Sequence, residues 1–405
     1  MDMMRHCIAA AAFAALLSST GAHAEISNGV VKIGVLNDQS SLYADAAGPG
    51  SVLAAQMAVE DFGSLGPGLR LEVVSADHQN KPDIGSAIVR RWFDVDGVDA
   101  VLDLPNSGVA LAVNEITRGS RHALLASSTA SSDLTGKACS PNTVQWTFDT
   151  WSIANATVKS VVERGGASWF FLTADYAFGQ ALERDGKAAV VANNAKVVGS
   201  VRHPIGTSDF SSFLLQAQSS KAKVIGLANA GGDTSTAIKQ ASEFGIPQGG
   251  QTLAALLIFI SDVHAIGLQT AQGLLFTEAF YWDLNDRTRQ WSKRFAARNN
   301  GKMPTMNHAG VYSSVLAYLN AVKATNSDDG AEVIARMKER PIQDDLFGAV
   351  TVRPDGRAIH DMYLFKVKKP EESKGPWDYY ALVNVIPADQ AFRPIAEGGC
   401  PMVQK

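Results

Sequence analysis

The stretch that most narrows the possible fold of this chain is residues 98–114, VDAVLDLPNSGVALAVN. An apolar run ends there at a polar turn, residues 105–108, and apolar residues then recur at helical spacing. This order indicates a strand, a turn and a helix that Asn106 or Ser107 caps. The free N–H groups of the first helical turn, at the positive end of the helix dipole, can hold a small anion. The alternative to an anion-binding site, for a single turn of this kind, is a capped connection that binds no ligand.

The rest of the chain repeats this unit in two series. The strand-like runs of the first series are residues 30–36, 69–74, 98–104 and 122–126, and those of the second are residues 169–172, 197–203, 224–228 and 253–258. Helical patterns alternate with these runs. The chain has 405 residues, which is too long for a single core, and its two series predict an α/β fold of two doubly wound parallel-sheet lobes. Ligands in such sheets bind beyond the carboxyl ends of the strands.

The last third of the chain is less regular. Its predicted elements are a short strand at 274–277, helices at 284–299, 307–325 and 330–340, strand-like runs at 348–352 and 362–367, and an edge strand at 377–386. The turn Arg-Pro-Asp-Gly at 353–356 is expected to join the two strand-like runs.

The N-terminus has the pattern of a secretory signal peptide. A short positive region precedes an apolar run, residues 7–17, that is too short to span a bilayer, and an A-x-A site follows at residues 22–24. We predict cleavage after Ala24, which removes residues 1–24 and leaves an exported mature chain. No later apolar run is long enough to cross a membrane, so the mature chain is expected not to be membrane-inserted.

Charge and motif content argue against several classes of function. The formal net charge is −4, and Lys and Arg are scattered rather than clustered, so no nucleic-acid partner is expected. The sequence has no G-x-S-x-G elbow, no H-E-x-x-H pair and no Gly-Lys-Ser/Thr phosphate loop. The histidines that follow the signal peptide never fall two within one helical turn. We therefore predict a protein that is not an enzyme and that uses neither a cofactor nor a metal ion.

Two cysteines remain after removal of the signal peptide, Cys139 and Cys400. In an oxidising compartment they most simply form one disulfide, which ties the tail back to the end of the first series of strands. Two unpaired buried thiols are the alternative, and a metal site needs more ligands than these two cysteines.

Polar turns and aromatic side chains together indicate a ligand cleft between the lobes. The polar turns follow strands at residues 37–43, 105–108, 127–133 and 229–233. The aromatic residues interleaved with them are Tyr43, Tyr176, Phe178, Phe259, Phe280, Tyr281, Trp282 and Tyr312. Helix N-termini and hydroxyls suit a carboxylate, and apolar faces suit the body of a small ligand. Each aromatic residue taken singly is more often a core residue than a ligand contact.

Several short motifs are informative through their order and spacing. They are Lys-Ile-Gly-Val at 32–35, Ser107, Ser-Ser-Thr-Ala-Ser-Ser-Asp-Leu-Thr at 127–135, Asp-Tyr-Ala-Phe-Gly at 175–179, Gln-Gly-Leu-Leu at 272–275 and Asp-Gly-Arg at 355–357. With them, about residues 30–367 resemble the type I periplasmic binding proteins, in the leucine/isoleucine/valine-binding branch that serves ABC importers.

The resemblance implies a domain organisation and partners. It implies a hinge of three crossings between the lobes, near Thr147, Thr277 and Phe347. The expected division is residues 25–147 plus 278–346 in lobe 1, 148–277 plus 347–386 in lobe 2, and 387–405 in a C-terminal tail. The resemblance further implies a periplasmic monomer that binds a small carboxylate and delivers it to the membrane permease of an ABC importer.

The resemblance also implies roles for individual residues. Ser107 and the turn Ser128–Ala130 match ligand contacts of the first lobe in the amino-acid binders, and Phe178 matches a tyrosine of the second lobe. With the polar turns and the aromatic residues, the expected ligand-binding residues are Tyr43, Asn106, Ser107, Ser127, Ser128, Thr129, Ala130, Phe178, Asn229, Phe259 and Tyr281.

Two departures from the family pattern bear on the ligand. Phe178 lacks the hydroxyl of the matching tyrosine, and residues 256–261, where an acidic partner for a ligand ammonium should fall, contain no carboxylate before Asp262. An unpaired ammonium in a closed cleft costs roughly several kcal/mol. We therefore expect a small organic acid, with an aromatic acid favoured, rather than a branched-chain amino acid. An amino acid of the same importer class is the alternative, and a periplasmic sensor that signals through a separate partner is another.

Overall fold

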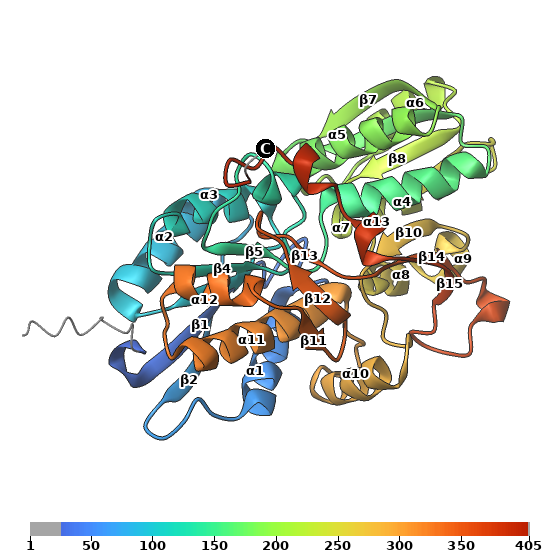
Figure 1. The fold of residues 1–405 in the computed structure, drawn as a ribbon. Coiled ribbons are helices and arrows are strands. Elements are labelled where there is room, and N and C mark those ends of the chain that lie inside the picture. Colours follow the sequence, from blue (N-terminus) through green and yellow to red (C-terminus); the bar gives the residue numbers. More distant parts are fainter. Residues whose placement is uncertain (1–25, 404–405) are drawn as a thin grey trace, which may run out of the picture.

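The computed structural model describes residues 26–403, so the predicted signal peptide lies outside the described residues. Two parallel sheets form the centres of two lobes (Figure 1). The sheet of lobe 1 has the order β2-β1-β3-β4-β5, with β1 Val30–Asn37, β2 Arg70–Asp77, β3 Ala100–Asp103, β4 Ala123–Ala126 and β5 Thr143–Gln145. The sheet of lobe 2 has the order β7-β6-β8-β9, with β6 Ser168–Ala174, β7 Lys196–His203, β8 Val224–Ala228 and β9 Thr252–Ala255. The predicted α/β fold with two parallel-sheet lobes is confirmed.

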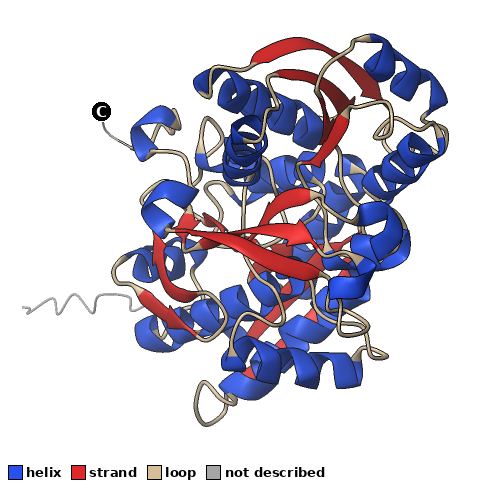
Figure 2. Cartoon of the chain, turned by 90° about the vertical axis from the view of Figure 1, so that its right-hand side faces the viewer, coloured by secondary structure: helices blue, strands red, loops and turns tan. Residues whose placement is uncertain are grey.

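Helices lie on both sides of the parallel sheets (Figure 2). Those of lobe 1 are α1 Gly48–Phe62, α2 Pro82–Arg91, α3 Ser107–Thr117, α10 Asp286–Arg298, α11 Met306–Thr325 and α12 Gly330–Lys338. Those of lobe 2 are α4 Thr150–Glu163, α5 Ala177–Ala192, α6 Ser211–Ser219, α7 Gly232–Glu243, α8 Ile260–Ile266 and α9 Leu268–Ala271. Strand β3 shows why both faces are covered. Ala100 and Leu102 belong to one core cluster, and Val101 between them belongs to another.

The turn between β3 and α3 has the predicted form of a capped helix start. Asn106 is the capping residue, because its side-chain oxygen accepts hydrogen bonds from the N–H groups of Gly108 and Val109 at 2.9 and 3.1 Å. Asp103 and Leu104 before it have positive φ angles of 83° and 54°. This conformation is unfavourable for residues other than glycine, and it turns the chain sharply at the end of the strand.

Two smaller antiparallel sheets complete the lobes. The order β10-β14-β15 unites β10 Leu275–Glu278, β14 Met362–Val367 and β15 Tyr380–Ile386. Phe276 and Phe365 of this sheet share a core cluster with Leu172 of β6, so the sheet belongs to lobe 2. The order β11-β12-β13 unites β11 Ile342–Asp344, β12 Gly348–Val352 and β13 Ala358–Ile359 in lobe 1. Strand β15 is an edge strand, as predicted.

Three connections join the lobes. Residues 146–149 lead from β5 to α4, residues 279–285 lead from β10 to α10, and residues 360–361 lead from β13 to β14. Phe347, near which the sequence places the third crossing, lies between β11 and β12, upstream of the last connection. The lobe boundaries inferred from the sequence stay a prediction.

The predicted role of the turn 353–356 is wrong. It joins β12 to the two-residue strand β13 rather than to residues 362–367. The chain is diverted because Arg357 and His360, which follow the turn, are fully buried and bind backbone carbonyl groups of the connection 146–149. Residues 362–367 then pair with β10 and β15 in the other lobe.

Two further elements begin or end earlier than predicted. Helix α1 starts at Gly48 instead of Val52, where the small residue Gly50 lets the ring of His308 approach so closely that a Cβ would stand 2.4 Å from its Nε2. Strand β9 ends at Ala255 instead of Ile258, because the apolar residues that follow leave the sheet and line a pocket between the lobes.

The expected disulfide between Cys139 and Cys400 is present, with Cα atoms 5.6 Å apart. Among residues 26–403, no helix combines the length and the apolar character needed to cross a membrane.

Candidate functional site

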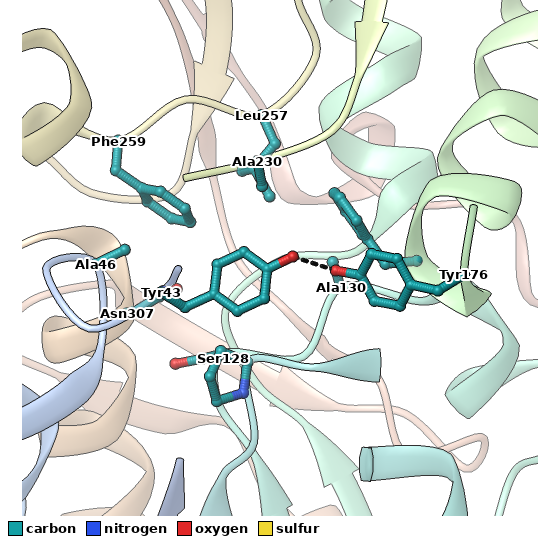
Figure 3. A pocket seen from close by; sticks show the side chains of 11 residues that line it. Tyr43, Ala46, Ser128, Ala130, Tyr176, Ala230, Leu257, Phe259 and Asn307 are labelled. Atoms are coloured by element: carbon teal, nitrogen blue, oxygen red, sulfur yellow. Dashed lines mark hydrogen bonds between the residues drawn. The ribbon is translucent and has the colours of Figure 1, made fainter. Parts of the chain in front are cut away.

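The candidate site is a small pocket between the lobes, at the carboxyl ends of the parallel strands (Figure 3). Its lining residues are Tyr43, Ala46, Pro105, Ser128, Ala130, Tyr176, Phe178, Ala230, Leu257, Phe259 and Asn307. All of them except Asn307 lie on loops or first helical turns that follow β1, β3, β4, β6, β8 or β9. Ligands collect at this edge in open α/β folds.

Two tyrosines meet in the middle of this pocket. The hydroxyl groups of Tyr43 from lobe 1 and Tyr176 from lobe 2 are hydrogen-bonded to each other, and Figure 3 shows both rings reaching across the gap. Burial raises the pKa of both hydroxyls above the ordinary value, so both keep their protons at neutral pH. The tyrosine pair therefore offers hydroxyl protons, not a charge.

The loop that carries Tyr43 is held by one carboxylate. Asp38 accepts hydrogen bonds from the backbone N–H groups of Tyr43 and Ser41, at 2.8 and 2.9 Å, and from the side chain of Asn80 at 2.7 Å. Burial acts to raise the pKa of Asp38, but these hydrogen bonds outweigh it and lower the pKa below the ordinary value. Asp38 is thus ionised and fixes the loop that presents Tyr43.

Ser128 lines the pocket, but its hydroxyl group donates its hydrogen bond to a second buried carboxylate, away from the pocket. The acceptor is Asp103, which also accepts from Asn37 at 2.8 Å. Burial raises the pKa of Asp103 to about 6. Asp103 lies behind Ser128 and is not itself a lining residue. The oxygen of Ser128 therefore faces the pocket as an acceptor.

Asn307, in the first turn of α11, is buried to 1% exposure, and its Oδ1 has no hydrogen-bond partner in the described part of the chain. Buried polar groups are almost always hydrogen-bonded, so an unpaired amide oxygen in a pocket marks a position where a hydrogen-bond donor of a ligand or of water can bind. No sequence pattern pointed to Asn307, because it lies in the first turn of a helix far along the chain from the other lining residues.

The pocket lining carries no charged side chain. None of the eleven lining residues is Asp, Glu, Lys, Arg or His. Asp262, the first carboxylate after the expected position, accepts from the N–H of Phe259 at 2.9 Å and from Ser235 at 3.3 Å, and it caps α8 instead of lining the pocket. No group of three or more His, Cys, Asp or Glu side chains suited to a metal ion occurs within residues 26–403.

The lobes are closed on one another in this structure. The N–H of Gly232 at the start of α7 donates to the carbonyl of Leu42 at 3.4 Å, next to the tyrosine pair. The remaining free volume is about 10 Å³, which is roughly the room that one water molecule needs. A ligand larger than water must therefore separate Tyr43 from Tyr176 to enter.

The structure brings together five of the eleven residues that the sequence assigned to ligand binding. Tyr43, Ser128, Ala130, Phe178 and Phe259 line the pocket. The expected residues that lie outside the lining are Asn106, Ser107, Ser127, Thr129, Asn229 and Tyr281. Their roles as ligand contacts stay a prediction.

Several of these six residues are engaged elsewhere in the protein. The oxygen of Asn106 is taken by the cap of α3, and Ser107 accepts from the N–H of Ser131 at 3.2 Å. Asn229 pairs with Thr234 at 2.7 Å. Tyr281 donates to the carbonyl of Trp377 at 3.1 Å, within the core of lobe 2.

The lining residues that the expected set omits are Ala46, Pro105, Tyr176, Ala230, Leu257 and Asn307. Tyr176 could have been found, because it stands two residues before Phe178 in the motif at 175–179 and is one of the interleaved aromatic residues.

The family model for periplasmic binding proteins matches residues 30–375. The chain belongs to this family. A periplasmic binding protein of Burkholderia mallei has 49% sequence identity and a TM-score of 0.90, over 93% of this chain and 100% of that one. A Burkholderia xenovorans protein described as a branched chain amino acid ABC transporter periplasmic ligand-binding protein has 41% identity and a TM-score of 0.81, over 92% and 99% of the two chains.

A third relative is described as a Leu/Ile/Val-binding protein homolog. The Leu/Ile/Val-binding protein homolog 6 of Brucella abortus is 25% identical over 364 residues, which are 88% of this chain and 91% of the relative. The protein is thus a periplasmic binding protein that captures a small ligand for an ABC importer, and it is a binding protein rather than an enzyme.

Proposed function

We propose that this periplasmic binding protein captures a small organic acid that carries no ammonium group, with an aromatic or branched aliphatic body, and delivers it to the permease of its importer. The observation that carries the proposal is the lining of the pocket, which is apolar and aromatic and has no charged side chain. The ligand lies in the pocket between the two lobes.

The polar groups of the pocket suit a carboxylate. The hydroxyls of Tyr43 and Tyr176 and the amide of Asn307 can donate hydrogen bonds to a carboxylate, and hydrogen bonds with one ionised partner are stronger than those between neutral groups. Phe178, Phe259 and Leu257 provide apolar walls for the rest of the molecule.

A zwitterionic amino acid fits these groups less well. Its ammonium group would find only neutral oxygens, such as those of Ser128 and Asn307, in a pocket closed to water. Leaving a buried charge without an ionic partner costs roughly several kcal/mol.

A branched-chain amino acid is the second candidate, because of the relatives. The Burkholderia xenovorans protein is described as a branched chain amino acid binder, and the Brucella protein is a Leu/Ile/Val-binding homolog. These relatives support the second candidate more directly than the first. A neutral amide at Asn307 would then be the partner of the ammonium group.

The test compares a ligand that carries an ammonium group with two ligands that do not. Leucine and 4-methyl-2-oxopentanoate share a carboxylate and a branched chain, and benzoate extends the series to an aromatic body. The mature protein, unfolded and refolded to remove bound ligand, is titrated with each compound and followed by thermal unfolding. Ligand at about 100 times its dissociation constant adds roughly 2.7 kcal/mol, a shift of several degrees. A shift with the oxo acid or benzoate and not with leucine supports the proposal, whereas a shift with leucine alone overturns it.

The variant Asn307→Asp sharpens this test because it adds a negative charge without changing the size of the side chain. A carboxylate ligand at about 5 Å then meets a repulsion of roughly 3 kcal/mol at an effective dielectric of about 20, so its affinity falls by about 100-fold. Leucine binding would be kept or strengthened by the new partner for its ammonium group. The matched control is Asn320→Asp, on the exposed far end of the same helix, and it should change neither affinity.

A further inference from the structure

Arg357, just before β13 of lobe 1, and His360, in the third connection, both bind the first connection between the lobes. The guanidinium of Arg357 donates to the carbonyl groups of Trp146 and Phe148, at 2.7 and 2.8 Å, in the first connection. His360, in the third connection, has its Nε2 atom 3.2 Å from the same carbonyl of Trp146. Arg357 and His360 are fully buried. Any bending of the hinge that moves the first connection away from Arg357 and His360 must break or lengthen these contacts.

The C-terminal segment covers this junction. We call residues 387–400 the C-terminal strap. The ring of Phe392 lies 4.4 Å from the guanidinium of Arg357 and packs edge-on against His360, with ring centres 5.4 Å apart. Phe392 is itself buried. The strap thus keeps water away from the buried cation and its carbonyl partners, which strengthens their hydrogen bonds.

The two ends of the strap are fixed to different lobes. It leaves β15 of lobe 2, and the N–H of Ala388 donates to Asp361 at 3.0 Å. Its other end is Cys400, which is bonded to Cys139 between β4 and β5 of lobe 1. Arg393 in the middle donates to the carbonyl of Ser132, also in lobe 1, at 3.0 Å. The disulfide therefore closes a fourth covalent path between the lobes.

We propose that the C-terminal strap is a fourth hinge element, which stiffens the junction at Arg357 and limits opening of the cleft. The strap is too long to limit opening simply as a tether between the lobes. Residues 387–399 could span roughly 40 Å if fully extended, at about 3.3 Å per residue, so the disulfide alone would allow wide opening. The strap acts through the packing of Phe392, and the disulfide holds that side chain close enough to return after each opening.

The test uses the whole mature protein without ligand, so its outcome does not depend on the proposed ligand. The variants are Phe392→Leu, which removes the aromatic cover, and the double variant Cys139→Ser/Cys400→Ser, which frees the end of the strap. Hydrogen exchange is followed at the amides of Trp146, Asp149 and Arg357, residues of the junction whose N–H groups donate to nearby Ala126, Ser152 and Asp355. Small-angle scattering reports opening as a larger radius of gyration.

Two control variants separate hinge loosening from a general loss of stability. Glu397→Gln changes an exposed side chain within the strap, and Phe213→Leu removes an aromatic ring that packs against His203 in lobe 2. We expect about tenfold faster exchange at the three junction amides in both test variants, because exchange there follows local opening, and a larger radius of gyration. Dithiothreitol should convert the wild type to the behaviour of the double variant.

The proposal is overturned if junction exchange in Phe392→Leu stays within twofold of the wild type. It is equally overturned if exchange rises to the same extent in every part of the protein, as for Phe213→Leu, since the strap would then serve only global stability.

Discussion

Replacing Arg357 by methionine is the perturbation that most directly tests the buried hinge junction. The guanidinium makes hydrogen bonds of 2.7, 2.8 and 2.9 Å to the carbonyl groups of Trp146, Phe148 and Ala358, and it lies 3.7 Å from the carboxylate of Asp149. Its side chain is wholly inaccessible to solvent. Burial lowers the pKa of Arg357 to about 10, so the group is charged at neutral pH.

The magnitude follows from what methionine leaves behind. Methionine fills much of the volume of the arginine stem, so the cavity contribution is small. Three carbonyl groups and one carboxylate nevertheless lose a cationic partner in a dry environment. Breaking a buried ion pair by removing one partner costs roughly 3–5 kcal/mol. The variant also avoids the cost of burying the guanidinium, which offsets a part of this loss. We expect Arg357→Met to lower the free energy of unfolding by an amount in this range.

Equilibrium unfolding in urea measures this change from the midpoints at constant slope. Arg357→Lys should lie between the wild type and Arg357→Met, because an ammonium keeps the charge but cannot reach two carbonyl groups as a planar fork does. The control is Arg70→Met, whose side chain is 71% exposed and should change stability by less than about 0.5 kcal/mol. A loss of less than about 1 kcal/mol in the free energy of unfolding of Arg357→Met would refute the reasoning. It would mean that the hydrogen bonds of the buried guanidinium contribute little to the stability of the junction.

Three further predictions use the same unfolding assay. The double variant Cys139→Ser/Cys400→Ser opens a loop of 261 residues and should lose about 5–6 kcal/mol by the chain-entropy model. Reductant should lower the stability of the wild type to the same value, and an unchanged midpoint would contradict this. Burial, with Asp328 nearby, raises the pKa of Asp99 to about 7, so the stability that Asp99 contributes below pH 4 is lost as the pH rises to 7. Asp99→Asn should therefore gain roughly 1.4 kcal/mol per pH unit relative to the wild type over that range, and a flat difference would count against the raised pKa. Tyr176→Phe should destabilise the ligand-free protein by about 1–3 kcal/mol, because the Tyr43 hydroxyl is left buried without its partner, and no loss would mean that water replaces that partner.

Local sequence patterns were sufficient to predict the framework of the fold. The alternation of apolar strands with polar turns and helices gave the two parallel-sheet lobes, because each unit buries its own apolar residues against its neighbours. The cap at Asn106 was also predictable, since it depends only on residues within four positions of each other.

The direction of side chains at the ends of the strands was not predictable in this way. Asp103 and Leu104 adopt left-handed backbone conformations, which bring Pro105 to the pocket, while the cap engages Asn106 and buries Ser107. The residue types do not predict this conformation, because neither Asp103 nor Leu104 is glycine.

The remaining site residues depend on contacts between distant parts of the chain. Asn307 reaches the pocket because α11 packs against α1, where the ring of His308 bonds to the carbonyl of Ala47 at 2.8 Å. The wrong strand partner predicted for the turn 353–356 has a similar cause, since Arg357 binds carbonyl groups about 210 positions earlier in the chain. Single-sequence patterns carry no information about such partners.

The hydroxyl protons of Tyr43 and Tyr176 bear on whether an anion or a cation fits between the two rings. Each hydroxyl has one proton, and when Tyr43 and Tyr176 bond to each other, only one of the two protons can lie between them. A carboxylate placed between the rings can accept both protons, so binding exchanges one neutral hydrogen bond for two that involve a charge. An ammonium group in the same place could use only the oxygen lone pairs and would leave both hydroxyl protons without an acceptor. If the ligand is the proposed organic acid, each lobe therefore supplies one of the two hydroxyl donors that hold its carboxylate.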